Sequence, residues 1–325
     1  MTERDVALPT GSAQLAGTLA TPDGPPAPAV LLLGGTFSDL RDGDADPRHR
    51  PDIPPHGMYR VLSEGLVAAG LAVLRFDRRG CGSSTGSRPD RATEIADALA
   101  AWAWLDREES VAGAAAMVGE SAGAHVLCRV IAAGAAPSAV VLQGALHRSI
   151  GGLIDFNASR ARAYWERGEA ERAWMWGNAR YEYESAVIGA EMVRAIEEGR
   201  LSIRVEDERG TFERRLDDLD FDIRYPPAEQ LHFVQCPCLI LHGADDLNVP
   251  VDDAFDTART LWAAGNRDVE LTVLARADHS MQATPDDEDE RLRERMSMQS
   301  FRRPFHHRYP GPIVEFLTRH LGNGR

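Results

Sequence analysis

Two serines lie in the pattern Gly-x-Ser-x-Gly, which can present a hydroxyl group as a nucleophile. Ser121 lies in MVGESAGAHV (residues 117–126), and Ser84 lies in GSSTG (82–86). An apolar run precedes Ser121 and an alanine-rich helical pattern follows it, which is the strand–turn–helix context that a nucleophile elbow requires. Ser84 comes several residues after its predicted strand and well before the next helix, so we expect it in a flexible loop. The context therefore selects Ser121.

A serine hydroxyl is a weak nucleophile unless a base takes its proton and a carboxylate orients that base. His279, in VELTVLARADHSM, follows the last predicted strand, so it should stand at the sheet edge where Ser121 stands. The other histidines that we weighed are expected inside the helix after Ser121, packed at a strand end, or in a basic tail segment (His125, His242, His306 and His307). We therefore predict that His279 is the base.

Two adjacent carboxylates, Asp245 and Asp246, follow another predicted strand in LILHGADDLNVP. Neighbouring side chains seldom share one role, so we expect one to face the histidine and the other to cap the next helix or to meet solvent. After the preceding strand, LQGALHRSI is followed by no carboxylate until Asp155. Asp278 adjoins the histidine but would have difficulty turning back to it, so we expect it at the surface.

Short apolar runs must supply the strands that position these groups. The runs lack strict alternation, as strands buried on both faces of a parallel sheet do. Amphipathic patterns between them predict helices. Strand alternating with helix predicts a doubly wound, mostly parallel α/β sheet, in which ligands bind beyond the carboxyl ends of the strands. The predicted strands are 5–9, 14–20, 29–35, 71–77, 114–119, 138–144, 237–243 and 269–275, and the helices are 58–69, 91–105, 122–133, 252–264 and 312–321.

Residues 145–234 interrupt this alternation with helical and charged stretches. We predict that they form a mainly helical cap over the site, between a first part of the core (1–144) and a second part (235–325). Tryptophans of this segment either fill its own core or touch the substrate. The aromatic side chains that we consider for a substrate pocket are Tyr164, Trp165, Trp174 and Tyr181.

Composition excludes several classes of function. The net charge is −14, and no lysine occurs among the 36 basic residues. The lack of lysine excludes Schiff-base and pyridoxal-phosphate chemistry and serine hydrolases with a lysine base. The negative charge argues against nucleic acid or an anionic membrane as a partner. Four cysteines form no disulfide framework, and no signal peptide or membrane-spanning run is evident, so we expect a cytoplasmic protein.

The acidic run TPDDEDERLRER (284–295) alternates irregularly with arginine. This pattern is typical of a solvated helix whose charges pair within it, rather than of a metal site. No other spacing of metal ligands stands out, so we expect neither a metal nor another cofactor.

The chain resembles an α/β-hydrolase from about residue 28 to its end. GESAGA is similar to the carboxylesterase elbow, and LLLGGTFSDLRDGD followed by LRFDRRGCGSST resembles bacterial hydrolases related to dienelactone hydrolases and prolyl oligopeptidases. In that family a G-x-x-D motif carries the acid. Matched from Gly243, it implies Asp246, which gives the order nucleophile, acid, base. The D-x-R-G-x-G-x-S loop from Asp77 to Ser84 is a structural signature, which implies that Ser84 has no chemical role.

The resemblance also implies an oxyanion hole made of two backbone N–H groups, one from Ala122. The second comes from a loop that usually begins His-Gly, and here it begins Gly34-Gly35. Thr36 then matches the donor, with Phe37 as the alternative, and Gly35 adjoins the substrate. Because the histidine is missing, support for this loop must come from other side chains.

These features together predict a serine hydrolase that forms an acyl-enzyme on Ser121 with a small-molecule carboxylic ester or thioester. An acyltransferase, a cyclase or a peptidase would use the same residues. A ligand-binding protein on a retired hydrolase scaffold is the alternative from a different class.

Overall fold

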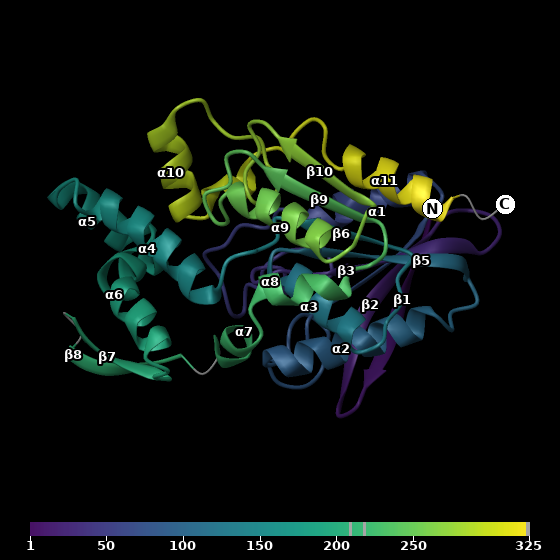
Figure 1. Cartoon of the computed structure of the whole chain (residues 1–325), viewed down its shortest axis with the longest axis horizontal. Coiled ribbons are helices and arrows are strands. Elements are labelled where there is room, and N and C mark those ends of the chain that lie inside the picture. Colours follow the sequence, from purple (N-terminus) through teal and green to yellow (C-terminus); the bar gives the residue numbers. More distant parts are fainter. Residues whose placement is uncertain (208–209, 217–218, 323–325) are drawn as a thin grey trace.

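One eight-stranded sheet forms the centre of the molecule (Figure 1). The computed structural model describes residues 1–207, 210–216 and 219–322. The strand order is β1-β2-β4-β3-β5-β6-β9-β10; β1 and β2 are antiparallel to their neighbours, and all other pairs are parallel. The strands are β1 (Thr2–Thr10), β2 (Ala13–Thr21), β3 (Ala27–Leu33), β4 (Ala72–Phe76), β5 (Val111–Glu120), β6 (Ala139–Gln143), β9 (Cys238–Gly243) and β10 (Val269–Leu274).

Helices cover both faces of this sheet, which confirms the predicted doubly wound α/β fold. The apolar faces of α1 (Met58–Ala68) and α11 (Gly311–Leu321) pack on one side of the sheet. The helices α2 (Arg91–Leu105), α3 (Ala122–Ala132) and α9 (Asp252–Ala263) pack on the other. Each of the eight predicted strands and five predicted helices coincides with one of these elements.

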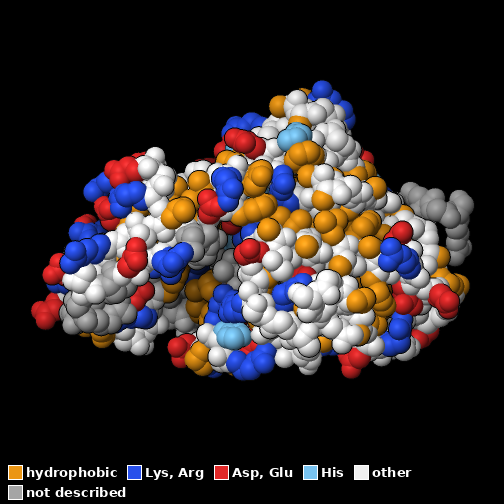
Figure 2. All heavy atoms as spheres, turned by 90° about the horizontal axis from the view of Figure 1, so that it is seen from below, with side chains coloured by type: hydrophobic (Ala, Val, Ile, Leu, Met, Phe, Trp, Pro, Cys, Tyr) orange, Lys and Arg blue, Asp and Glu red, His pale blue; other side chains and the backbone are white. Residues whose placement is uncertain are grey.

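Between β6 and β9 the chain leaves the sheet and forms a separate lobe (Figure 1). Its elements are α4 (Ile150–Trp165), α5 (Glu169–Asn178), α6 (Arg180–Glu197) and the hairpin β7 (Ser202–Asp207) and β8 (Gly210–Arg215). After the hairpin, α7 (Asp220–Arg224) lies where the lobe meets the core and contacts both α2 and α4 (Figure 1). We call residues 145–226 the insertion. Acidic and basic side chains are spread over the outer surface of its lobe (Figure 2).

The end of the segment that we predicted as a cap belongs to the core. Here α8 (Pro227–Gln230) and the 3₁₀ turn η2 (Leu231–Phe233) contact α3, and η2 also contacts α9. Leu231 and Val234 are buried in the same apolar cluster as the sheet. These apolar side chains, at the end of an otherwise polar segment, return the chain to the sheet before β9.

The acidic run forms α10 (Glu288–Met296), followed by the 3₁₀ turn η3 (Gln299–Arg302). We expected a solvated helix paired within itself, and this expectation was wrong. Leu292 and Met296 are buried against the insertion. Arg293 Nε donates a hydrogen bond to the hydroxyl of Tyr164 on α4 over 2.7 Å. Leu292 and Met296 lie one helical turn apart among the charged residues of this run, so both side chains can pack against the insertion.

No helix in the described residues is long and apolar enough to cross a bilayer.

Candidate active site

Ser121 lies on a sharp turn between the end of β5 and the start of α3. Its backbone has φ 52° and ψ −120°, a conformation that costs a non-glycine residue about 1–3 kcal/mol. Two glycines allow the close approach that the turn requires. A Cβ on Gly119 would lie 2.6 Å from Ala124 Cα, and one on Gly123 would lie 2.1 Å from the carbonyl oxygen of Leu33. The motif therefore places Ser121 where the strand, the turn and the helix meet, as the sequence context predicts.

His279 and Asp246 are brought together at the same edge of the sheet. The distance between His279 Nδ1 and Asp246 Oδ2 is 2.7 Å, and both residues are buried. The other carboxylate oxygen, Oδ1, accepts backbone N–H groups from Asn248 (2.7 Å) and Val249 (2.9 Å). Burial raises the pKa of Asp246, but the charge of His279 and the hydrogen bonds of His242 and His279 to this carboxylate outweigh that effect and lower the pKa overall. Asp246 is thus a fixed, ionised partner for the imidazole.

A glycine explains why this carboxylate stands next to the histidine. The last residue of β9 lies so close to the His279 loop that a Cβ on Gly243 would be 2.3 Å from the carbonyl oxygen of Asp278. Three residues later Asp246 faces His279, whereas Asp245 turns away and accepts from Thr284 and from Arg291 of α10. The two adjacent carboxylates have separate roles.

His242 also contacts the acid, which the sequence analysis did not predict. This histidine is fully buried, and its Nε2 lies 3.2 Å from Asp246 Oδ2 and 2.9 Å from the carbonyl oxygen of Val249. A strand-end histidine four residues before the acid was the available signal. Its contact holds the strand end and the carboxylate in one arrangement.

The second ring nitrogen of His279 faces the end of β5. Ser121 N–H donates to the carbonyl oxygen of Gln143 (2.8 Å), and the next residue, Gly144, lies against the imidazole, since a Cβ there would be 3.1 Å from His279 Cε1. The Ser121 hydroxyl has no hydrogen bond within the described part of the chain. Such contacts are often loose in a ligand-free enzyme and tighten with substrate bound.

Glu120, the residue before Ser121, brings a second carboxylate to this place. Its Oε1 lies 3.9 Å from His279 Nε2. Its Oε2 accepts the backbone N–H of Gly35 (2.7 Å) and the hydroxyl of Ser38 (3.1 Å). The sequence analysis named Ser121 and Ala122 of GESAGA but not Glu120; the signal for Glu120 is a charged residue at the end of an otherwise apolar strand.

The pKa of His279 lies above its ordinary value for electrostatic reasons. Burial lowers the pKa of the imidazole, but the charge and hydrogen bond of Asp246 outweigh this, and the charge of Glu120 acts in the same direction. The raised pKa makes the neutral imidazole a stronger base and stabilises the imidazolium that forms when the imidazole accepts a proton.

The loop after β3 receives its support from side chains other than the missing histidine. Besides Glu120, Arg78 donates to the carbonyl oxygen of Gly35 (2.6 Å), and Arg50 donates to that of Thr36 (2.7 Å). Both arginines pair with Asp39, which is fully buried. The N–H groups of Thr36 and Phe37 have no acceptor among the described residues.

Gly35 does not line the cavity described below, although we predicted that it adjoins the substrate. Its N–H is used by Glu120, and a Cβ would lie 2.4 Å from Glu120 Oε2. Gly35 is therefore an anchor of the loop. Ala122 is the first residue of α3, so its N–H has no acceptor within the helix. It remains available beside Ser121.

A cavity of about 720 Å³ lies between the sheet edge and the insertion. This volume falls in the range of small-molecule sites. Ser121, His279 and Glu120 line it together with Thr36 and Phe37. The groups that the sequence analysis selected from distant parts of the chain therefore open into one space.

Only one of the four aromatic residues considered for the pocket lines this cavity. Tyr181 does so. Tyr164 is buried inside the insertion with its ring 5.7 Å from that of Trp174, and Trp165 packs against the same cluster. The prediction failed for these three residues because α10, which contributes Leu292 to the cluster, covers this side of α4.

Asp278 is buried, which corrects the expectation of a surface position. Its Oδ1 accepts the N–H groups of Ser280 (3.0 Å) and Gln282 (2.9 Å), and its side chain lines the cavity. Burial raises the pKa of Asp278 to about 6.

The expectation that Ser84 lies in a flexible loop is also corrected, because its hydroxyl donates to the carbonyl oxygen of Asp77 (2.7 Å) and accepts from the N–H of Ala16 (2.9 Å).

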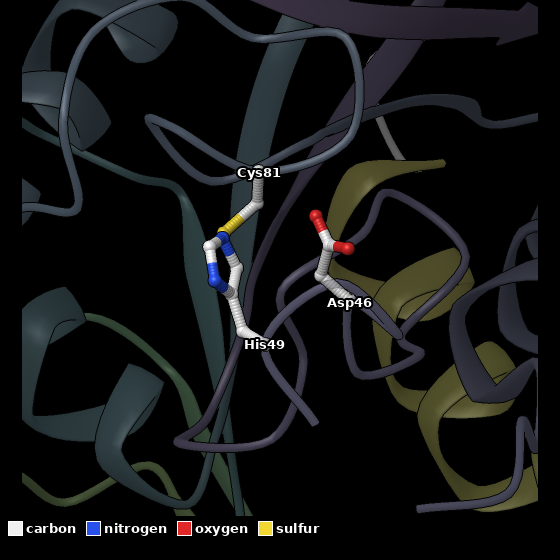
Figure 3. A group of neighbouring side chains, drawn as sticks. All are labelled: Asp46, His49 and Cys81. Atoms are coloured by element: carbon white, nitrogen blue, oxygen red, sulfur yellow. The ribbon is translucent and has the colours of Figure 1, made fainter. Parts of the chain in front are cut away.

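A group of potential metal ligands lies outside the cavity. Figure 3 shows the ring of His49 beside the sulfur of Cys81, with Asp46 nearby. Both carboxylate oxygens of Asp46 already accept hydrogen bonds from Arg48, and Oδ2 also accepts from the N–H of Gly82 (2.9 Å). Burial raises the pKa of the Cys81 thiol, which disfavours the thiolate. The three residues thus join two loops, and Asp46 is already neutralised by an arginine.

Comparison with known proteins agrees with this architecture. The esterase Pf2001 from Pyrococcus furiosus has a TM-score of 0.59 and 19% identity, over 99% of this chain and 92% of that one. The α/β hydrolase GrgF from Penicillium sp. sh18 gives 0.58 and 18%, over 99% and 100%. Est1E from Butyrivibrio proteoclasticus gives 0.57 and 12%, over 98% and 99%.

No curated protein matches the sequence significantly. The family model described as "Alpha/beta hydrolase family" matches residues 30–290, which is most of the chain. With this match, and with the same fold in the structures above, the chain belongs to the alpha/beta hydrolase family and is an enzyme of the hydrolase type.

Proposed function

We propose that this protein is a serine hydrolase that cleaves a carboxylic ester or thioester through an acyl-enzyme on Ser121. The observation that carries the proposal is the 2.7 Å contact between His279 and Asp246, in the same cavity as a serine on a strained elbow. The insertion acts as the cap of this cavity.

His279 Nε2 takes the proton of Ser121 as its oxygen attacks the carbonyl carbon. As the carbonyl oxygen gains negative charge, it accepts hydrogen bonds from the backbone N–H of Ala122 and from that of Thr36 or Phe37. His279 then gives its proton to the leaving group, and the C–O or C–S bond breaks. A water molecule, deprotonated by the same imidazole, then attacks the acyl carbon. The bond to the Ser121 oxygen breaks as His279 returns the proton to that oxygen, which releases the acid and restores the hydroxyl of Ser121. Asp246 holds the imidazole in the tautomer with its proton on Nδ1 and stabilises the imidazolium.

The cellular site proposed is a reducing compartment, the cytoplasm. All four cysteines are free thiols, and three of them are buried: Cys81, Cys128 and Cys238. Fractionation of the native host with an antibody against the protein tests this location.

Labelling with a fluorophosphonate probe tests the nucleophile. The wild-type protein should be labelled and should hydrolyse p-nitrophenyl esters, whereas Ser121→Ala should lose both. Ser84→Ala, which removes the other serine in a Gly-x-Ser-x-Gly pattern, is the matched control and should keep both. Equal labelling of wild type and Ser121→Ala would overturn the proposal, as would a labelled peptide that contains Ser84.

A further inference from the structure

One wall of the cavity is made of aliphatic side chains from the insertion. Ile150, Leu153 and Ile154 project from one face of α4, at the spacing of one helical turn, and Ile188 and Met192 project from α6. All five are half-buried, and Ile188 and Met192 also pack against the buried apolar cluster between α6 and the hairpin. They therefore present apolar surface to the cavity.

The two helices are held closely enough to make this wall continuous. A Cβ on Gly189 of α6 would lie 2.2 Å from Ala158 Cβ of α4. On the cavity side of this crossing, the first half of α4 runs beside the second half of α6, where a Cβ on Gly151 would lie 3.7 Å from the side chain of Ile196. The wall is thus a feature of a fixed helix pair.

Two charged side chains beside this wall, Arg295 and Glu184, are paired within the protein. Arg295 is paired with the buried Glu182 and contacts Asn248, and Glu184 is paired with Arg180. No charge is left over that would select an ionic ligand at these two positions. The aliphatic wall is therefore the feature with which a ligand can gain most, through the removal of apolar surface from water.

We propose that the ester or thioester carries an extended aliphatic chain, which lies along the wall formed by α4 and α6. This inference rests on the proposed function and names its substrate class. The cavity of about 720 Å³ is far larger than an acetyl group needs. Each methylene transferred from water to such a wall improves binding in the transition state by about fourfold.

Two series of esters test the proposal and identify the part of the substrate that carries the chain. In the first, p-nitrophenyl acetate, butyrate, octanoate and dodecanoate vary the acyl group. In the second, the acetates of ethanol, butanol and octanol vary the alcohol, with acetate release as the readout. One series should show kcat/KM rising by about fourfold per methylene until the wall is filled. Two flat series would overturn the proposal.

Variants of α6 locate the chain on this wall. Ile188→Trp fills the space beside the wall. It should abolish the increase in kcat/KM for octanoate over butyrate, or the equivalent increase in the alcohol series. Val187→Trp, the neighbouring residue that is 41% exposed, is the matched control and should leave the profile unchanged. If both tryptophan variants give the wild-type profile, the chain does not lie here.

A milder variant guards against a folding defect. Ile154→Gln keeps the size of the side chain and should flatten the slope of kcat/KM against chain length. Thermal unfolding should confirm that each variant is folded. If acetate esters are hydrolysed through Ser121 but kcat/KM does not depend on chain length in either series, this inference fails and the proposed function stands. If no ester is hydrolysed through Ser121, the proposed function itself has failed.

Discussion

The Glu120 carboxylate is tied to Gly35 by a 2.7 Å hydrogen bond from the backbone N–H of Gly35 to Oε2. Glu120 directly precedes Ser121, and Gly35 directly precedes Thr36. The contact therefore fixes the distance between the nucleophile and the loop that carries the second proposed oxyanion donor. In this chain Glu120, Arg78 and Arg50 hold the loop by hydrogen bonds, in place of a histidine at its start.

Gly35→Ala should disrupt this contact because the added Cβ would lie 2.4 Å from Glu120 Oε2. We expect kcat for p-nitrophenyl butyrate to fall by about 10²–10³, the usual effect of losing one oxyanion donor. Gly177→Ala, where nothing lies within 4 Å of the new Cβ, should leave kcat unchanged. A wild-type kcat for a well-folded Gly35→Ala protein would contradict the role given to this contact.

Asp246→Asn should lower kcat by on the order of 10⁴, because an amide that donates to His279 favours the wrong tautomer. The adjacent variant Asp245→Asn is the control, since Asp245 contacts Thr284 and Arg291 instead. Steady-state hydrolysis of p-nitrophenyl butyrate measures both. Comparable losses in the two variants would argue against Asp246 as the specific partner of the base.

The pH dependence should reflect the raised pKa of His279. The imidazole must be neutral to act as a base, so kcat/KM should fall as the pH drops through a value above the ordinary 6.5 of histidine. Glu120→Gln removes a charge that raises this pKa. The acid limb of the profile should therefore move to lower pH. Asp278→Asn is a second, separable variant, because Asp278 titrates near 6 in the same cavity. A Glu120→Gln profile that is unchanged, or moved to higher pH, would refute the electrostatic assignment.

Asp222 should stabilise the junction between the insertion and the core. It lies 3.1 Å from both Arg91 on α2 and His125 on α3. Burial raises the pKa of Asp222, but the hydrogen bond from His125 and the charge of Arg91 lower it overall from 3.8 to about 2. Because the folded-state pKa is depressed, the stabilisation is present above pH 3.8 and is lost as the pH falls towards 2.

Asp222→Asn should therefore lower the free energy of unfolding by about 2 kcal/mol at neutral pH. The difference from wild type should shrink in urea titrations below pH 4, where the wild-type carboxyl also becomes protonated. Asp220→Asn, in the same short helix, pairs only with Arg224 among the described residues and should have a small effect. If the difference in the free energy of unfolding between Asp222→Asn and wild type grows on acidification, the depressed pKa of Asp222 is contradicted.

Local patterns predicted the fold well because the elements of a parallel sheet are strongly marked. Buried strands such as Ala27–Leu33 are uniformly apolar, and α1 repeats apolar residues at helical spacing. The position of Ser121 followed from the strand before it and the glycines around it. These features depend on residues within a few positions of one another.

The predictions that failed depended on contacts between distant segments. Tyr164 was assigned to the pocket from its residue type, but α10 lies against it, more than a hundred residues further on. Asp278 was placed at the surface because it would have difficulty turning back to the adjacent His279, yet it is buried and two backbone N–H groups donate to its carboxylate. The same holds for Glu120, whose partners Gly35 and Ser38 lie some eighty residues earlier in the chain.

The amino-acid sequence by itself predicted the order of strands and helices and the turn that carries Ser121, because periodicity and glycine placement act locally. Only the tertiary structure decided what supports the loop at Thr36 and which side chains face the cavity; it also placed Asp246, the carboxylate that the G-x-x-D motif implied, against His279. Those outcomes depend on how far-separated segments converge at the edge of the sheet, where hydrogen bonds and burial select among residues that look equivalent in sequence.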